Sequence, residues 1–219
     1  MSKKAYPLRN LSLQAIYDKL FAFYGPQHWW PGETPFEVAV GAILTQNTNW
    51  ANVEKAIHNL KKHGVLSSQA IHGLPVDRLA ALIRPSGYYN IKANRLRAFI
   101  DYFADNYKGS MARMKKANDK TLREELLALK GVGQETADSI LLYALDKPIF
   151  VIDAYTKRIL SRHGIMETSA SYEAYQQLFH NTFDKDVTLF NEYHALLVRV
   201  GKDYCKPEPK CAGCPLSNS

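Results

Sequence analysis

With 219 residues, the sequence is long enough for one or two domains with a sizeable buried core. Hydrophobic residues make up 46% and charged residues 22%, as in ordinary globular proteins, and the longest apolar runs are far shorter than a membrane-spanning helix. The 28 Lys and Arg exceed the 21 Asp and Glu, and this basic excess is typical of nucleic-acid-binding proteins and also of many other small basic proteins.

The predicted elements are helices almost throughout. Apolar residues recur at helical spacing over residues 11–21, and Thr34, Pro35 and Glu37 are typical of a helix start. Further helices are predicted over residues 50–62, 75–83, 91–105, 119–129, 136–145, 154–162, 172–180 and 191–202. Strand-like alternation is nearly absent, so the sequence predicts an all-α fold.

A glycine turn separates two of these helices. Gly131 and Gly133 permit positive φ and a close backbone approach, and they precede a helix that begins near Thr136. The N–H groups at the start of such a helix can bind a phosphate. The segment therefore predicts a helix-hairpin-helix element that binds the DNA backbone, with an ordinary helical hairpin as the alternative.

The three cysteines all lie in the last fifteen residues, as Cys205, Cys211 and Cys214. Pro207 and Pro209 exclude a continuous helix there. Clustered cysteines in a chain without a secretory signal favour metal ligation over a disulfide framework, so we expect a cytoplasmic protein with a metal-binding tail. Accidental clustering of unrelated thiols is the alternative.

The order of these segments resembles the helix-hairpin-helix, Gly/Pro-Asp superfamily of DNA glycosylases typified by endonuclease III. The resemblance runs from Thr34 to Cys214 and depends on segments 44–48 and 87–93, the hairpin, residues 151–153 and the cysteines. It implies two helical lobes. One is a six-helix barrel over residues 27–147 that carries the hairpin, and the other joins residues 1–26 to residues 148–219 with the cysteine loop.

The resemblance also implies the partner. Damaged double-stranded DNA would bind across the cleft between the lobes of a monomeric protein, with the target nucleotide flipped out of the duplex. No membrane partner is expected, and the enzyme would work in the cytoplasm on the nucleoid.

The resemblance further implies that Asp153 is the catalytic residue, since its carboxylate can stabilise a cationic sugar and orient the attacking water. Asp153 also suits the N-cap of the helix that follows. Bifunctional members of the superfamily carry a Lys where Glu135 stands, and a carboxylate cannot form the Schiff base. We therefore expect a DNA N-glycosylase without AP lyase activity.

Within the superfamily, the sequence most resembles the bacterial 3-methyladenine DNA glycosylases of endonuclease III type. The segments responsible are residues 28–31, 44–50, 84–90 and 130–138. In that group aromatic side chains sandwich the excised base, which here implies Trp29 or Trp30 on one side and Trp50 on the other, with Glu135 in the same pocket. A hydrophobic core is the alternative fate of these tryptophans.

The resemblance implies DNA contacts as well. Gln46 and Tyr88 would insert into the duplex. The hairpin residues implied are Gly131, Gly133, Gln134 and Thr136, and the implied phosphate contacts are Arg84, Lys92, Arg95, Lys157 and Arg158. A solvated basic surface is the alternative for each of the latter.

The family's iron–sulfur loop has the pattern Cys-x6-Cys-x2-Cys-x5-Cys, whereas Cys205, Cys211 and Cys214 follow Cys-x5-Cys-x2-Cys with no fourth cysteine in the sequence. We expect a [4Fe–4S] cluster, with zinc as the alternative for three thiolates. Two other functions stay open: an endonuclease III-like glycosylase and AP lyase for damaged pyrimidines, and a DNA-binding relative without catalysis.

Overall fold

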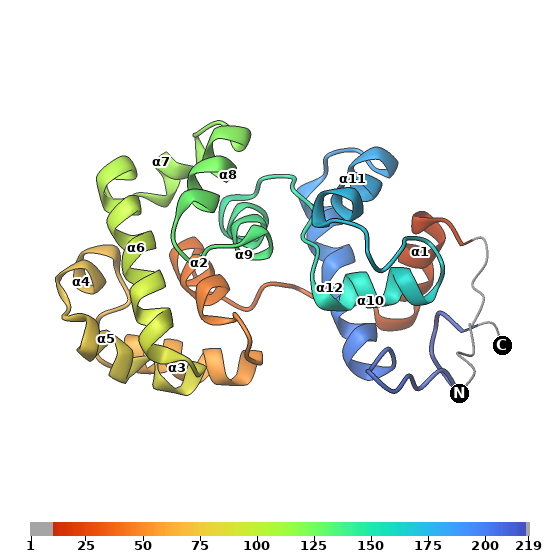
Figure 1. The fold of residues 1–219 in the computed structure, drawn as a ribbon, viewed down its shortest axis with the longest axis horizontal. Coiled ribbons are helices and arrows are strands. Elements are labelled where there is room, and N and C mark those ends of the chain that lie inside the picture. The colour runs from red at the N-terminus through yellow and green to blue at the C-terminus, as the bar shows by residue number, and fades with distance from the viewer. Residues whose placement is uncertain (1–10, 218–219) are drawn as a thin grey trace. The chain divides into compact units, whose positions relative to one another are not determined.

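The structure, a computed structural model, describes residues 11–217 as an all-helical chain that divides into two compact units. Among the described residues, one unit combines 11–29 with 148–217, and the other comprises Trp30–Lys147. No strand occurs among residues 11–217, so the all-α prediction is confirmed (Figure 1). Within the same residues, no helix is long and apolar enough to cross a membrane.

The unit Trp30–Lys147 is built around one buried helix. Its elements are α2 (Pro35–Leu44), α3 (Trp50–Lys62), α4 (Ser68–Gly73), α5 (Val76–Leu82), the 3-10 turn η1 (Arg84–Ser86), α6 (Tyr89–Tyr107), α7 (Met111–Lys115), α8 (Asp119–Ala128), α9 (Gln134–Ser139) and the π-helical turn η2 (Ile140–Ala144). Every residue of α2 from Glu37 to Leu44 is buried, as expected for a helix that is apolar on all sides. It packs on α3, α6, α9 and η2, and so lies at the centre of the unit.

The predicted hairpin is present in this unit. Helix α8 ends at Ala128, Gly131 adopts φ 85°, and α9 begins at Gln134 with Gly133 as its N-cap. The positive φ favours glycine at this position, and a side chain there would also displace the Arg95 side chain of α6. The buried carboxylate of Asp138 on α9 accepts two hydrogen bonds from Arg123 on α8, 2.7 and 3.0 Å long, which joins the two helices of the hairpin.

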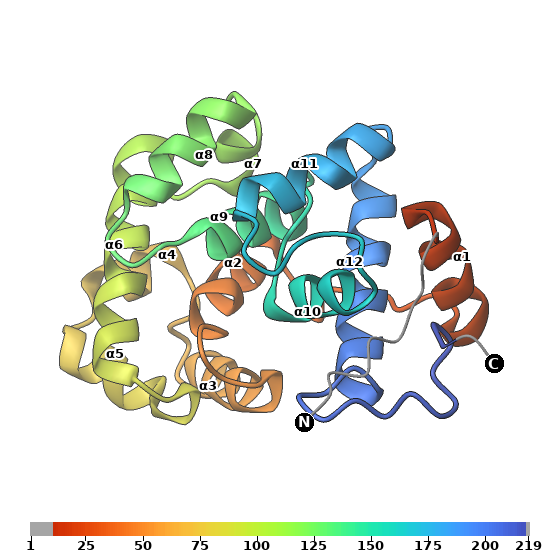
Figure 2. The same ribbon diagram turned by 45° about the vertical axis from the view of Figure 1, so that its right-hand side comes forward.

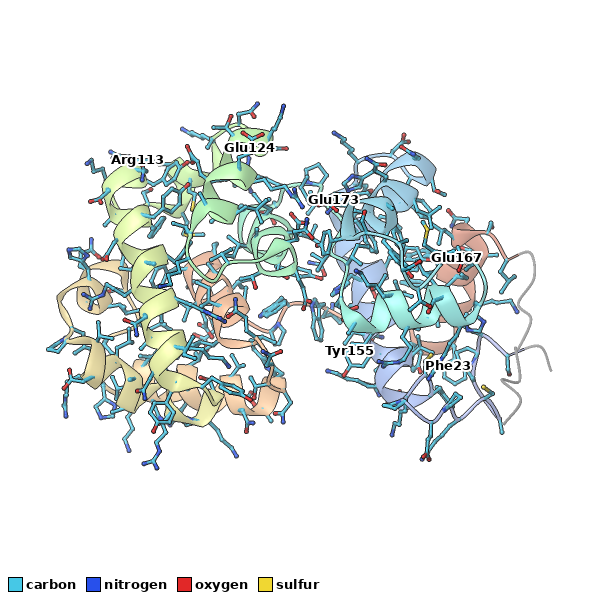
Figure 3. All side chains as sticks on the ribbon, viewed as in Figure 1. Phe23, Arg113, Glu124, Tyr155, Glu167 and Glu173 are labelled. Atoms are coloured by element: carbon cyan, nitrogen blue, oxygen red, sulfur yellow. The ribbon has the colours of Figure 1, made fainter. Side chains whose placement is uncertain are left out.

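The other unit contains α1 (Leu13–Tyr24), α10 (Ala154–Arg162), α11 (Tyr172–Thr182) and α12 (Val187–Asp203). Helix α12, blue in Figure 1, packs against both α1 and α10, and Figure 2 shows the same arrangement from a second direction. Gly201 permits the close approach of α10 to α12, because a side chain there would clash with Tyr155. Tyr155 is labelled in Figure 3.

Most predicted helices are found within a few residues of their expected ends. The short helices α4 and α7 were not predicted, and α12 begins at Val187, four residues before the expected start. Asp186 explains the earlier start, since its Oδ1 accepts hydrogen bonds from the Thr188 and Leu189 N–H groups and so caps the helix.

Candidate active site

Asp153 is positioned as the N-cap of α10. Its Oδ1 accepts a 2.7 Å hydrogen bond from the Thr156 N–H, and the residue is only 8% exposed. On α12, the His194 Nε2 lies 3.8 Å from the same carboxylate oxygen. Burial lowers the pKa of His194 from its ordinary value, and the negative charge of Asp153 opposes that shift. The start of α10 thus places the buried carboxylate of Asp153 beside the buried imidazole of His194.

His194 is a site residue that sequence reasoning missed. It lies on α12 among the buried residues Phe190, Tyr193 and Leu197, where an imidazole is the exception. A polar residue on the buried face of an apolar helix was the available signal.

The tryptophans predicted to hold a base are not arranged as a slot. Within the unit Trp30–Lys147, the rings of Trp30 and Trp50 touch edge to face, with centroids 5.2 Å apart and planes at 90°. Tyr143 of η2 packs on Trp30 with a centroid distance of 4.9 Å. Gly41 of α2 lies against both indoles, and a Cβ there would lie 3.3 Å from the Trp50 ring and 3.5 Å from the Trp30 Nε1. Trp29 belongs to the other unit, where the ammonium of Lys202 lies 5.7 Å from its ring centroid.

The predicted hairpin residues are joined by a polar network centred on Gln46. Its Nε2 donates to the Gly131 carbonyl at 2.9 Å and to the Thr136 hydroxyl at 3.0 Å, and its Oε1 accepts a hydrogen bond from Arg95. The Gln46 amide is therefore held against the hairpin turn in this structure. Gln134 and Glu135 lie in the first turn of α9, where Glu135 is exposed.

Tyr88, the other residue predicted to enter the duplex, is 69% exposed and adopts φ 45° as the N-cap of α6. Ile91, one turn further along α6, is 54% exposed. Tyr88 and Ile91 thus form a pair of exposed large side chains at one helix end.

The basic residues differ in their surroundings. Lys157 lies with its ammonium 5.5 Å from the Tyr175 ring centroid, and the Arg158 guanidinium lies 5.0 Å from that of Tyr155. The Arg158 Nε also donates to the Cys205 carbonyl at 2.6 Å. Arg158 is thus already bound to the cysteine tail.

The expectation that Lys92 contacts phosphate is wrong. Lys92 is 1% exposed, and its Nζ donates to the carbonyls of Leu44 at 2.8 Å and Ser86 at 2.6 Å. Burial, assisted by the nearby positive charge of Arg95, lowers the pKa of Lys92 to about 8. The side chain joins the end of α2 to η1, the elements that precede Gln46 and Tyr88.

Lys92 should make the stability of the protein depend on alkaline pH. Because its pKa is about 8 when folded and 10.5 ordinarily, the unfolded chain binds more protons between these values, and stability must rise with pH. Relative to Lys92→Met, we expect the wild type to gain about 1–2 kcal/mol between pH 7.5 and pH 9.5. Urea unfolding at both pH values measures this, with the exposed Lys116→Met as control. A difference that stays constant or shrinks with pH contradicts the assignment.

The three cysteines do not form a complete metal site in the described part of the chain. Among residues 11–217, no three His, Cys, Asp or Glu side chains are arranged to hold a metal ion. Cys205 is buried, and its Sγ accepts a 3.4 Å hydrogen bond from Arg162. Three cysteines also leave one ligand position of a [4Fe–4S] cluster, or of a tetrahedral zinc ion, without a cysteine.

The tail also has protein contacts of its own. Arg162 donates to the carbonyls of Lys206 and Pro207, and Arg158 donates to that of Cys205. Leu216 is 1% exposed and anchors the far end of the loop.

Comparison with known proteins identifies the class. Residues 40–185 match the family model described as HhH-GPD superfamily base excision DNA repair protein. The match covers more than half of the chain, which therefore belongs to this superfamily. Within it, the protein is a DNA glycosylase, an enzyme that breaks the bond between a damaged base and its deoxyribose.

Three proteins similar to this chain are, by name, a DNA repair glycosylase, an endonuclease and a DNA glycosylase. A Methanocaldococcus jannaschii protein named "Putative DNA repair glycosylase MJ1434" is 49% identical over 92% of each chain. Endonuclease III of Thermotoga maritima is 31% identical over 84% of this chain and 81% of its own. The crystal structure of the H. pylori 3-methyladenine DNA glycosylase MagIII bound to 1,N6-ethenoadenine has a TM-score of 0.77 and 30% identity, covering 88% of this chain and 98% of that one.

Proposed function

We propose that this glycosylase is monofunctional and hydrolyses the N-glycosidic bond of alkylated purines of the 3-methyladenine type in double-stranded DNA. Asp153 is the proposed catalytic residue, Trp30 and Trp50 the proposed base-binding residues, and the hairpin the proposed DNA-backbone contact. The observation that carries the proposal is the pair of tryptophans packed over Gly41, because it offers a large aromatic surface for a purine.

A cationic base suits this aromatic surface. N3- and N7-alkylated purines carry a positive charge, and a cation against an indole face gains roughly 1–2 kcal/mol. The same charge makes the base a good leaving group, so no dedicated general acid is needed. The similarity to the H. pylori enzyme, a 3-methyladenine DNA glycosylase whose structure contains 1,N6-ethenoadenine, supports this substrate class.

Binding a base between Trp30 and Trp50 requires the rings to move. A base stacked on both sides needs about 7 Å between the two planes, twice the usual contact distance of carbon atoms. The rings stand in edge-to-face contact with centroids 5.2 Å apart, so one indole has to turn when the base enters. Trp50 is the first residue of α3 and follows the loop that contains Asn47 at φ 53°, which makes it the more suitable ring to turn. Trp29 is the weaker candidate, since Lys202 already places a cation near its ring.

Asp153 acts through its negative charge. As the bond to the base lengthens, positive charge develops on the sugar, and a nearby carboxylate stabilises it. The same carboxylate can accept a proton from the water that attacks the sugar carbon. His194 lies close enough to bias the orientation of the carboxylate, whose Oδ1 is already bound by the Thr156 N–H.

The substrate class is tested by comparing lesions under single-turnover conditions. Duplex DNA treated with a methylating agent supplies 3-methyladenine and 7-methylguanine, and synthetic duplexes supply 1,N6-ethenoadenine and thymine glycol. We expect release of the alkylated purines, measured by chromatography of the free base, and no release of thymine glycol.

Faster excision of thymine glycol than of any alkylated purine would contradict the proposal. That result would favour the endonuclease III-like alternative, which the similarity to the Thermotoga maritima enzyme supports. Absence of release from every lesion, with intact DNA binding, would instead favour a relative without catalysis.

A further inference from the structure

The segment that leads to Asp153 is buried but belongs to no helix or sheet. Phe150, Val151 and Ile152 are each at most 1% exposed. Backbone N–H and C=O groups buried in this way must find hydrogen-bond partners, or each costs free energy. Asp153 follows directly, so whatever binds this backbone also determines where the carboxylate lies.

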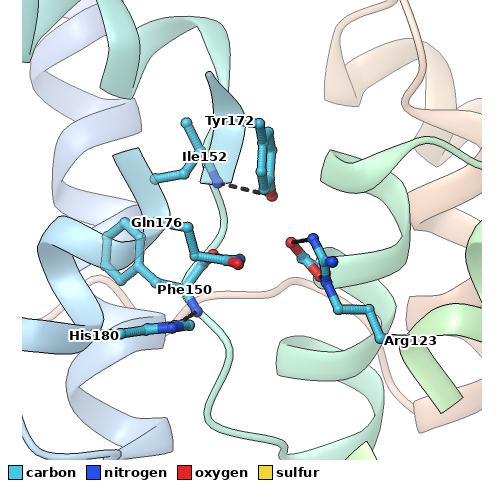
Figure 4. Close-up of polar contacts among 7 residues, drawn as sticks. Arg123, Phe150, Ile152, Tyr172, Gln176 and His180 are labelled. Atoms are coloured by element: carbon cyan, nitrogen blue, oxygen red, sulfur yellow. Dashed lines mark hydrogen bonds and ion pairs between the residues drawn. The ribbon is translucent and has the colours of Figure 1, made fainter. Parts of the chain in front are cut away.

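Side chains of α11 supply the partners. The Phe150 N–H donates to the His180 Nε2 at 3.0 Å, and the Phe150 carbonyl accepts from the Gln176 Nε2 at 2.7 Å. The Ile152 N–H donates to the Tyr172 hydroxyl at 3.2 Å. Figure 4 shows these residues, with Tyr172 at Ile152 and with Gln176 and His180 at Phe150.

The spacing of these residues on α11 explains how one helix can do this. Tyr172, Gln176 and His180 are four residues apart and therefore lie on one face of the helix. From Tyr172 to Gln176 the helix advances about 6 Å, which nearly matches the roughly 6.6 Å between Ile152 and Phe150 in an extended chain, and His180, one turn further on, binds Phe150 again. The groups bound are the N–H and C=O of Phe150 and the N–H of Ile152. A neighbouring antiparallel strand would bind the same three groups. Helix α11 thus takes the place of a strand.

The ring of Phe150 is held as firmly as its backbone. It stacks on Phe179 with centroids 3.6 Å apart, and Phe190 meets it edge to face at 5.4 Å. His180 in turn stacks on Phe190 with centroids 5.6 Å apart. The stacking on Phe190 thus fixes the orientation of the His180 ring, whose Nε2 accepts the hydrogen bond from the Phe150 N–H.

We propose that Tyr172, Gln176 and His180 are positioning residues for Asp153, acting through the backbone of Phe150 and Ile152. This rests on the proposed function, in which Asp153 acts on the sugar. A displacement of about 1 Å in a reacting group can lower a rate by roughly 100-fold, so loss of one of these hydrogen bonds should slow base release without weakening DNA binding.

Two variants each remove a hydrogen bond to the segment. Tyr172→Phe deletes only the hydroxyl, and Gln176→Met keeps the length of the side chain but removes the donor. We expect each to slow single-turnover base release by about 10-fold or more, with DNA affinity within about twofold of the wild type. The matched control is Gln177→Met, the same change at the exposed neighbouring position, which should keep the wild-type rate.

His180 offers a test by conservative rescue. His180→Gln retains an acceptor for the Phe150 N–H in its Oε1, whereas His180→Leu does not. We expect His180→Leu to slow base release about as much as Gln176→Met does, and His180→Gln to recover most of the rate. Equal rates in the two His180 variants would contradict the proposed role.

Amide hydrogen exchange gives a readout that does not depend on the lesion chosen. The Phe150 amide should lose protection in His180→Leu, and the Ile152 amide in Tyr172→Phe, while Gln177→Met changes neither. If the wild type releases no base from any lesion, the proposed function fails, and exchange still decides whether these hydrogen bonds hold the segment. Base release at the control rate by Tyr172→Phe and Gln176→Met, with only a lowered melting temperature, would overturn the positioning role.

Discussion

Asp153→Asn is expected to slow single-turnover base release by about 100-fold or more, as for loss of a general base, while the fold and the affinity for DNA persist. The fold should persist because asparagine is as good an N-cap as aspartate, and its amide oxygen can accept the hydrogen bond that the Thr156 N–H now gives to Oδ1. The substitution therefore removes the negative charge and little else.

A matched control is available in the same unit. Asp186 caps α12 through the Thr188 and Leu189 N–H groups, so Asp186→Asn makes the same chemical change at another helix N-cap. Its rate of base release should stay within about twofold of the wild type, and both variants should unfold at similar urea concentrations. An Asp153→Asn enzyme that releases base at nearly the wild-type rate would show that catalysis resides elsewhere.

The helices and the hairpin could be predicted because their signals are local. Thr34 with Pro35 marks the start of α2, and Gly131 with Gly133 marks the turn between α8 and α9. The short helices α4 and α7 also begin at serine N-caps, Ser67 and Ser110, but five or six residues cannot display a helical period, so the sequence did not reveal them.

Roles that depend on tertiary burial could not be read from the sequence. Lys92 looked like a surface phosphate contact, yet its ammonium is buried and donates to the carbonyl of Ser86 and to that of Leu44, which lies 48 residues away in sequence. The tryptophans could be identified as candidates, but whether they stack or touch edge to face depends on Gly41 and Tyr143. The spacing of Tyr172, Gln176 and His180 was visible in the sequence. Their backbone partners, however, lie 20, 26 and 30 residues upstream.

The second large effect concerns strand cleavage. We expect base release to leave the DNA strand intact, because the resemblance to the superfamily matches Glu135 to the position where bifunctional members carry the lysine that forms a Schiff base. Lys130 is the nearest lysine in sequence, but it is exposed and precedes Gly131, on the other side of the turn from α9. The abasic product should therefore need alkali or heat to break.

The most direct test of monofunctional hydrolysis is borohydride trapping during base release. Wild-type enzyme is incubated with a duplex that carries an alkylated purine, with borohydride in one arm and alkali in the other, beside a bifunctional glycosylase on its own substrate. The proposed mechanism predicts free base, a strand that breaks only after alkali, and no protein–DNA adduct on a denaturing gel. Efficient trapping of this protein on the DNA, or strand breakage without alkali at the rate of base release, would contradict it.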